Sequence, residues 1–119
     1  SSILLKCDKE QISRVIFNLI KNSVESIQQK AENTSNFDKI ITIEIFEINN
    51  QISIIIIDSG LGFKNIKNNI KDILNPYFTT KKNGTGLGLS IVNKIINDHN
   101  GEINFVSIPN GAKIEIRFN

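Results

Sequence analysis

The chain has 119 residues, 39% of them hydrophobic, and a formal net charge of +2, which is typical of one globular domain with a single core. No apolar run approaches the ~20 residues that a membrane-spanning helix needs. The small charge, without a dense basic stripe, gives no reason to expect a nucleic-acid partner.

The cysteine content and the first residues indicate where the chain resides and whether it belongs to a longer protein. Cys7 is the single cysteine, so an internal disulfide is excluded, no cysteine-based metal site is suggested, and we expect a reducing, cytoplasmic location. The sequence begins at Ser1, without an initiator methionine or a signal-peptide pattern. We therefore expect it to be a piece of a longer protein.

The first predicted element is an amphipathic helix over residues 9–30, after a short edge strand over residues 3–6. Asp8 is a typical N-cap residue, and Gln11 three positions later gives a capping-box pattern. Apolar residues then recur at helical spacing: Ile12, Val15, Ile16, Leu19, Ile20, Val24 and Ile27.

Two hairpins and a second helix follow. Alternating isoleucines predict a strand over residues 41–46. The pair Asn49-Asn50 predicts a hairpin turn, and a buried, Ile-rich strand over residues 51–57 follows it. Residues 87–99 form a second amphipathic pattern that Asn100-Gly101 closes. Residues 103–106 and 112–118 predict the second hairpin.

Residues 63–75, between the first hairpin and the second helix, could hold a short helix that Pro76 ends. Antiparallel hairpins beside helices predict the α+β class, with a mixed, mostly antiparallel sheet covered by helices on one face.

A glycine-rich motif, GTGLGL, occupies residues 84–89. A Rossmann site is excluded because a polar loop, and no strand, precedes the motif. A P-loop is excluded because Leu89 follows Gly88 where that motif requires lysine. Taken alone, the motif fits a phosphate-binding loop or a flexible entry to a helix.

Asp58 closes the buried strand and is followed by Gly60 and Gly62. A carboxylate at the rim of an apolar pocket can accept a hydrogen bond from an exocyclic amine such as that of adenine, and glycines let a flat ring lie against backbone. The alternative is an aspartate that caps its own turn.

Asn18 and Asn22 lie four residues apart on the first helix and therefore share one face. An amide oxygen there could ligate Mg²⁺, which prefers hard oxygen ligands. In a chain rich in asparagine, the alternative is that both are ordinary solvated residues.

Together these stretches resemble the ATP-binding catalytic domain of bacterial sensor histidine kinases, in the gyrase/Hsp90/MutL ATPase superfamily. Residues 18–23, NLIKNS, are similar to the N box, and residues 58–63, DSGLGF, to the first glycine box. Residues 76–81, PYFTTK, are similar to the F box, and residues 84–89 to the second glycine box. The short spacing between the last two resembles kinases of the nitrogen-regulation type, NtrB and NtrY.

The resemblance implies a two-layer α/β sandwich of the Bergerat type and a single ATP-binding catalytic domain over residues 1–119 of a longer histidine kinase. It implies that ATP and Mg²⁺ are bound. Asn22 would ligate Mg²⁺, with Asn18 on the same face and Lys21 near the phosphates, while Asp58 would bind the adenine amine over Gly60 and Gly62.

Residues 63–82 would form a mobile lid over ATP, with Phe78 of the F box anchoring its end and Thr79 among the nucleotide-binding residues. The remaining residues implied at the phosphates are Lys81, Lys82, Gly84, Thr85, Gly86, Leu87, Gly88 and Leu89. Backbone N–H groups at a helix N-terminus are suited to an anion, which would explain the glycines.

Three positions refine this comparison. Related ATPases carry at position 18 a glutamate that activates water. The amide of Asn18 cannot act as a general base, and loss of that base fits a kinase, for which hydrolysis of ATP would be waste. Ser23 replaces the common alanine. Ser26 stands where some relatives carry an aromatic residue over adenine, so that stacking contact is not expected.

The implied reaction transfers the γ-phosphoryl group of ATP to a histidine. His99, the single histidine, lies at the end of the second predicted helix, where we expect it to interact with terminal carbonyls. The acceptor would therefore lie outside this chain, on a dimerisation domain of the parent protein.

The implied partners are that phosphoacceptor domain and the receiver domain of a response regulator. The chain itself would be monomeric and the parent a homodimer, which could be anchored in the inner membrane. Two alternatives remain: a serine kinase of the anti-sigma-factor type on the same fold, and a module that binds nucleotide without transferring phosphate.

Overall fold

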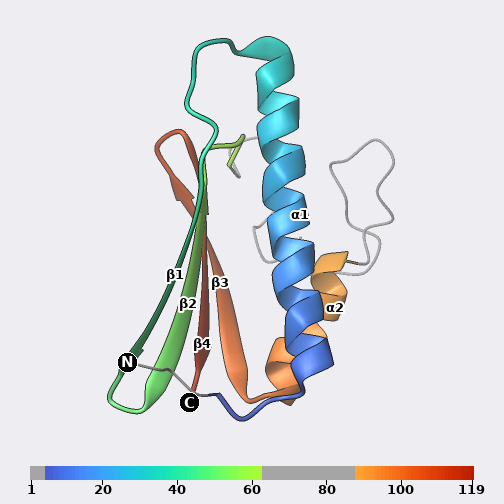
Figure 1. Cartoon of the computed structure of the whole chain (residues 1–119), viewed down its shortest axis with the longest axis vertical. Helices are drawn as coiled ribbons and strands as arrows, with labels where there is room; N and C mark the ends of the chain where they lie inside the picture. Colours follow the sequence, from blue (N-terminus) through green and yellow to red (C-terminus); the bar gives the residue numbers. More distant parts are fainter. Residues whose placement is uncertain (1–4, 63–87) are drawn as a thin grey trace.

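The structure, a computed structural model, describes residues 5–62 and 88–119. Its elements are α1 (Lys9–Asn33), β1 (Ile41–Ile48), β2 (Gln51–Asp58), α2 (Gly88–Asp98), β3 (Gly101–Ile108) and β4 (Gly111–Phe118). The strands form one sheet in the order β1-β2-β4-β3, and every neighbouring pair in it is antiparallel. Both helices lie on the same side of this sheet (Figure 1). The predicted α+β class and two-layer arrangement are confirmed.

Helix α1 begins where the sequence predicts it. The Asp8 carboxylate caps it by accepting a hydrogen bond from the Gln11 N–H at 3.1 Å. The helix continues to Asn33, three residues beyond the predicted end at residue 30, and the Thr34 N–H closes it on the Lys30 carbonyl at 2.9 Å. Its buried residues recur every four positions: Val15, Leu19, Ser23 and Ile27.

The core lies between the helices and one face of β2 and β4. Because side chains alternate along a strand, Ile52, Ile54 and Ile56 share the helix-facing side of β2 and are all buried. Opposite them on β4 lie the buried Phe118, Ile116 and Ile114. The same alternation places Asp58 on this buried face, at the end of the strand.

Both hairpins turn at asparagines with left-handed backbone. Asn49 and Asn50 have φ of 53° and 64°, as a two-residue turn of the hairpin type requires. Asn110, before Gly111, has φ of 66°. Strands β1 and β3 run two residues, and β4 one residue, further toward these turns than predicted. At their other ends, β2 extends to Asp58 and β3 starts at Gly101 rather than at residue 103.

One predicted strand is not found in the part of the chain that the structure describes. Of the expected edge strand over residues 3–6, Leu5 and Lys6 belong to no strand, and residues 3 and 4 lie outside the described part. Leu5 instead packs against the core cluster. Residues 63–87, which include the short helix expected before Pro76, also lie outside it. Neither helix in the described part combines the length and hydropathy of a membrane span.

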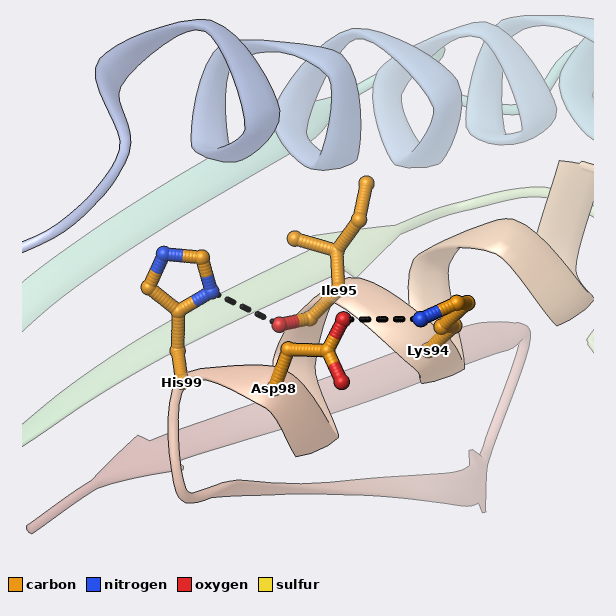
Figure 2. Close-up of polar contacts among 4 residues, drawn as sticks. All are labelled: Lys94, Ile95, Asp98 and His99. Carbon is orange, nitrogen blue, oxygen red and sulfur yellow. Dashed lines mark hydrogen bonds and ion pairs between the residues drawn. The ribbon is translucent and has the colours of Figure 1, made fainter.

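His99 joins the end of α2 to the start of α1. Its Nδ1 lies 2.8 Å from the Ile95 carbonyl oxygen, as Figure 2 shows, and its Nε2 accepts the Asp8 N–H at 3.1 Å. These partners assign a neutral ring with its proton on Nδ1. The predicted contact with a terminal carbonyl is confirmed. In addition, the ring satisfies the backbone N–H of the α1 N-cap, a role that the capping-box pattern assigns to Gln11.

Replacing His99 with leucine should therefore lower the free energy of unfolding by about 1 kcal/mol, because both hydrogen bonds are lost at similar side-chain volume. Urea unfolding measures the effect, with the same substitution at the exposed Asn97 as the matched control. Equal midpoints for the two variants would contradict the link between the helices.

Candidate functional site

A carboxylate lies at the end of β2 among apolar neighbours. Asp58 is 5% exposed, and its cross-strand neighbours are Ile41 on β1 and Ala112 on β4. Its Oδ1 accepts a hydrogen bond from the Gly60 N–H at 2.9 Å. A carboxylate can accept several hydrogen bonds, so this contact leaves capacity on the second oxygen. The loop after β2 thus begins as the turn that an aspartate followed by glycine predicts, and it holds a buried acceptor.

Helix α1 packs directly onto this loop. A Cβ added to Gly60 would overlap the Ser26 side chain and lie 3.0 Å from Asp58 Oδ1. The Ser26 hydroxyl accepts the Leu61 N–H at 2.9 Å. Only glycine fits between the helix and the carboxylate, so Gly60 is required for α1 to pack against the loop even without a ligand.

The loop also meets the β3–β4 hairpin. Gly62 has φ of 70°, and a Cβ on it would lie 2.5 Å from the Gly111 carbonyl oxygen. A Cβ on Gly111 would in turn overlap the Asp58 carbonyl oxygen. Two backbones therefore touch without side chains between them, which fixes the position of the loop against the sheet.

Lys30 of α1 connects the loop after β2 with the β3–β4 hairpin. Its Nζ donates to the Ser59 carbonyl at 2.9 Å and to the Asn110 carbonyl at 3.2 Å, and lies 4.6 Å from the centre of the Phe37 ring. Ser59 also extends the β1–β2 pairing, since its N–H donates to the Ile40 carbonyl at 3.1 Å and its hydroxyl accepts the Ile40 N–H at 2.9 Å.

One face of α1 carries a pair of asparagines. Asn18 and Asn22 are half-buried on it and four residues apart, as the sequence predicts, whereas Lys21 is exposed. Ser23, next to Asn22, is almost fully buried. The described part thus contains an amide pair on one face of α1 and, separately, a buried carboxylate at the end of β2.

Comparison with known proteins decides what kind of domain this is. The family of histidine kinase-, DNA gyrase B- and HSP90-like ATPases matches residues 7–119. The chain belongs to this family.

The relatives of this ATPase domain include sensor kinases of the nitrogen-regulation group. It is 34% identical over 110 residues to the nitrogen regulation protein NtrY of Azorhizobium caulinodans, covering 92% of the chain but 14% of that protein. It is 36% identical to an NtrY-like putative sensor histidine kinase of Rickettsia felis, covering 94% of the chain and 18% of the relative. The chain therefore spans about a sixth of the length of these relatives.

Solved structures agree with the fold. The catalytic domain of histidine kinase ThkA, in a nucleotide-free form, superposes with a TM-score of 0.75 at 31% identity, covering 94% of this chain and 68% of that one. The resemblance to histidine-kinase catalytic domains and the two-layer fold expected from it are confirmed.

Most of the predicted nucleotide-binding residues of the ATPase domain lie outside the described part. These are Phe78, Thr79, Lys81, Lys82, Gly84, Thr85, Gly86 and Leu87. Gly88 and Leu89 are described: Gly88 opens α2, and Leu89 is half-buried and packs against the core. The glycine motif therefore leads directly into a helix, as predicted.

Two residues that build the site were not predicted. Lys30 continues the polar side of α1 but carries no motif, and only the fold brings it to Ser59. The sequence predicts Gly111 only as part of a hairpin turn, since an Asn-Gly pair is a common turn signal. Nothing in the local pattern reveals that this glycine also touches the backbone of Asp58.

Gly111→Ala tests how tightly the loop of the ATPase domain is held. The new methyl group must displace the Asp58–Ser59 backbone, so we expect a loss of about 2 kcal/mol in unfolding free energy. We also expect shifted amide resonances for Gly60 and Leu61. The exposed Ser107→Ala on β3 is the control. A variant with unchanged stability and amide shifts would show that the backbones do not touch in solution.

Proposed function

We propose that this chain binds Mg·ATP and is the catalytic domain of a longer sensor histidine kinase. The observation that carries the proposal is the buried Asp58 carboxylate at the end of β2, held by Gly60 in a chain of the ATPase family. A buried carboxylate with hydrogen-bonding capacity to spare is a specific acceptor for a ligand amine.

The base would bind at this carboxylate. The adenine amine would donate to the Asp58 oxygen that Gly60 does not use. Gly60 and Gly62 would lie beneath the ring, since neither carries a side chain. Ser26 is engaged with the Leu61 N–H and adjoins Gly60, so its hydroxyl fixes the loop where an aromatic residue could have stacked on the base.

The phosphates would extend along the polar face of α1 toward the start of α2. Asn22 would offer its amide oxygen to Mg²⁺, and Lys21 would approach the phosphates. No group of three acidic, histidine or cysteine side chains in the described ranges is placed to hold a metal ion. A magnesium ion held by one amide, phosphates and water is consistent with its preference for oxygen ligands and retained waters.

The reaction proposed is phosphoryl transfer to the imidazole of a histidine outside this chain. The bond between the γ-phosphorus and the β-phosphate oxygen breaks, a bond from phosphorus to an imidazole nitrogen forms, and ADP leaves. The attacking nitrogen uses its lone pair, so no residue of this chain needs to act as a base. Positioning and charge stabilisation by Lys21, the metal and backbone N–H groups would supply the catalysis.

The partners follow from the same proposal. The relatives are much longer proteins, so we infer a parent with a dimerisation domain that carries the acceptor histidine, and a response regulator that receives the phosphate. His99 is unsuited as the acceptor, because both ring nitrogens are engaged between α1 and α2. Use of ATP is consistent with a cytoplasmic location for this domain.

Asp58→Asn provides the sharpest test of base binding. Asparagine keeps an oxygen for the Gly60 N–H but replaces the second oxygen with an NH₂ group, which cannot accept the adenine amine. We expect affinity for Mg·ATP and Mg·ADP to fall about 10- to 100-fold in calorimetric titrations, with little change in stability.

The exposed Asp38→Asn is the matched control and should bind as the unsubstituted chain does. Titrations without Mg²⁺ should show weaker binding, and Asn22→Ala should remove most of that dependence on the metal. Equal affinities for the Asp58 and Asp38 variants would rule out Asp58 as the adenine acceptor.

Phosphoryl transfer is tested in the parent protein with ATP labelled at the γ-phosphate. We expect a label that is lost in acid and retained in base, as for phosphohistidine, and that is absent in the Asn22→Ala variant. An acid-stable label would indicate a serine kinase. Binding of ATP without any labelled protein would indicate a nucleotide-sensing module.

A further inference from the structure

The Lys30 ammonium group binds carbonyls of other segments rather than those of its own helix. Lys30 lies in the last turn of α1, where a lysine commonly interacts with the terminal carbonyls of the same helix. Its Nζ instead donates to the Ser59 carbonyl at 2.9 Å and to the Asn110 carbonyl at 3.2 Å. None of the ion pairs in the described ranges includes Lys30. The charge is therefore committed to the loop after β2 and to the β3–β4 hairpin.

A third segment and the helix itself fix where this charge lies. The Lys30 ammonium nitrogen lies 4.6 Å from the centre of the Phe37 ring, a distance typical of a cation–π contact. The Lys30 carbonyl is held by the Thr34 N–H that closes α1. Figure 1 shows the end of β2 between α1 and the β3–β4 hairpin, which is the region that the ammonium group connects.

One peptide unit links Lys30 with Asp58. Its carbonyl belongs to Ser59 and accepts from Lys30, and its N–H belongs to Gly60 and donates to Asp58 Oδ1 at 2.9 Å. A trans peptide is planar, and its C=O and N–H bonds point in opposite directions. A cation bound at the oxygen therefore turns the N–H toward the carboxylate. The charges at the two ends also polarise the peptide, which strengthens both hydrogen bonds where water is largely excluded.

The loop needs this restraint because of Gly60. Glycine is required there for packing against Ser26, but without a side chain it leaves the peptide before it more free to rotate. The preceding peptide is held by its N–H at the edge of the sheet, and the following one by the Ser26 hydroxyl. Lys30 holds the peptide between these two at its carbonyl.

We propose that Lys30 is a positioning residue for base recognition, acting on Asp58 through the peptide that joins Ser59 to Gly60. By fixing the direction of the Gly60 N–H, Lys30 ties Oδ1 of the carboxylate to the loop. The other oxygen, Oδ2, is thereby oriented to accept the amine of a purine. This inference rests on the proposed nucleotide site and adds to it a residue that does not touch the nucleotide.

Lys30→Met removes the charge and both hydrogen bonds but keeps a side chain of similar length beside Phe37. We expect affinity for Mg·ADP and Mg·ATP to fall equally, by about 3- to 10-fold, because both nucleotides share the base. Lys30→Arg keeps a donor for the Ser59 carbonyl and should restore most of the affinity. Calorimetric titration of the whole chain measures these values. The exposed Lys9→Met on the same helix is the matched control and should bind as the unsubstituted chain does.

Two further readouts separate positioning of Asp58 from general support of the fold. In the Asp58→Asn background, Lys30→Met should have almost no further effect on affinity, because the oxygen that Lys30 positions is already absent. A residue that only supports the fold would lower affinity by the same factor in both backgrounds. In the nucleotide-free protein, Lys30→Met should move the Gly60 amide proton resonance upfield as its hydrogen bond to the carboxylate weakens, and Lys30→Arg should return it.

The outcomes separate the inference from the function on which it rests. An unsubstituted chain that binds no nucleotide overturns the site and the inference together. Normal nucleotide binding by Lys30→Met overturns the inference alone, and so does an equal loss of affinity with and without the Asp58 carboxylate. An unchanged Gly60 amide resonance in Lys30→Met also overturns it, because the peptide then does not link the two residues. A loss of affinity that requires Asp58, together with a shifted Gly60 resonance, supports it.

Discussion

The end of β2 can hold a buried carboxylate only because backbone meets backbone there. Gly60 leaves room for Ser26 of α1, and Gly111 leaves room for the carbonyl of Asp58 itself. Lys30 then binds carbonyls from both sides of this contact. A methyl group at either glycine would push the loop away from the helix or the hairpin. The position of Asp58, and with it any site built on the carboxylate, depends on this close approach.

Two buried polar residues, Ser23 and Asp58, interrupt the otherwise apolar core of the described part. Ile54 and Ile56 on β2 are buried, and the next residue on the same face is the buried Asp58. On α1 the buried apolar series of Val15, Leu19 and Ile27 is interrupted by Ser23. Each interruption lowers stability relative to an apolar residue, since burial of polar groups is costly unless they are paired.

Local patterns predicted the elements well, because caps, turns and periodicity act over a few residues. Asp8 caps α1, and Asn49-Asn50 turns the first hairpin, as expected. The same isoleucine alternation gave different results on two strands: Ile54 on β2 is 7% exposed, whereas Ile45 on the edge strand β1 is 54% exposed. The order of the strands in the sheet decides this difference in burial, because β1 is an edge strand and β2 is a central one. The sequence of either strand alone does not reveal that order. The contacts of His99 with Asp8 and of Lys30 with Asn110 join residues 91 and 80 positions apart, beyond the reach of any local rule.

The identity of residue 18 bears on how the proposed reaction divides between two domains. A domain that binds ATP before its acceptor arrives must keep water from attacking the γ-phosphate. An asparagine at position 18 lies on the face of α1 that carries Asn22, and an amide cannot take a proton from water at neutral pH. An imidazole brings its own lone pair and needs no such base. In the proposed reaction, absence of a base at this position would slow hydrolysis without slowing transfer to histidine, so the acceptor, and not this chain, would supply the attacking lone pair.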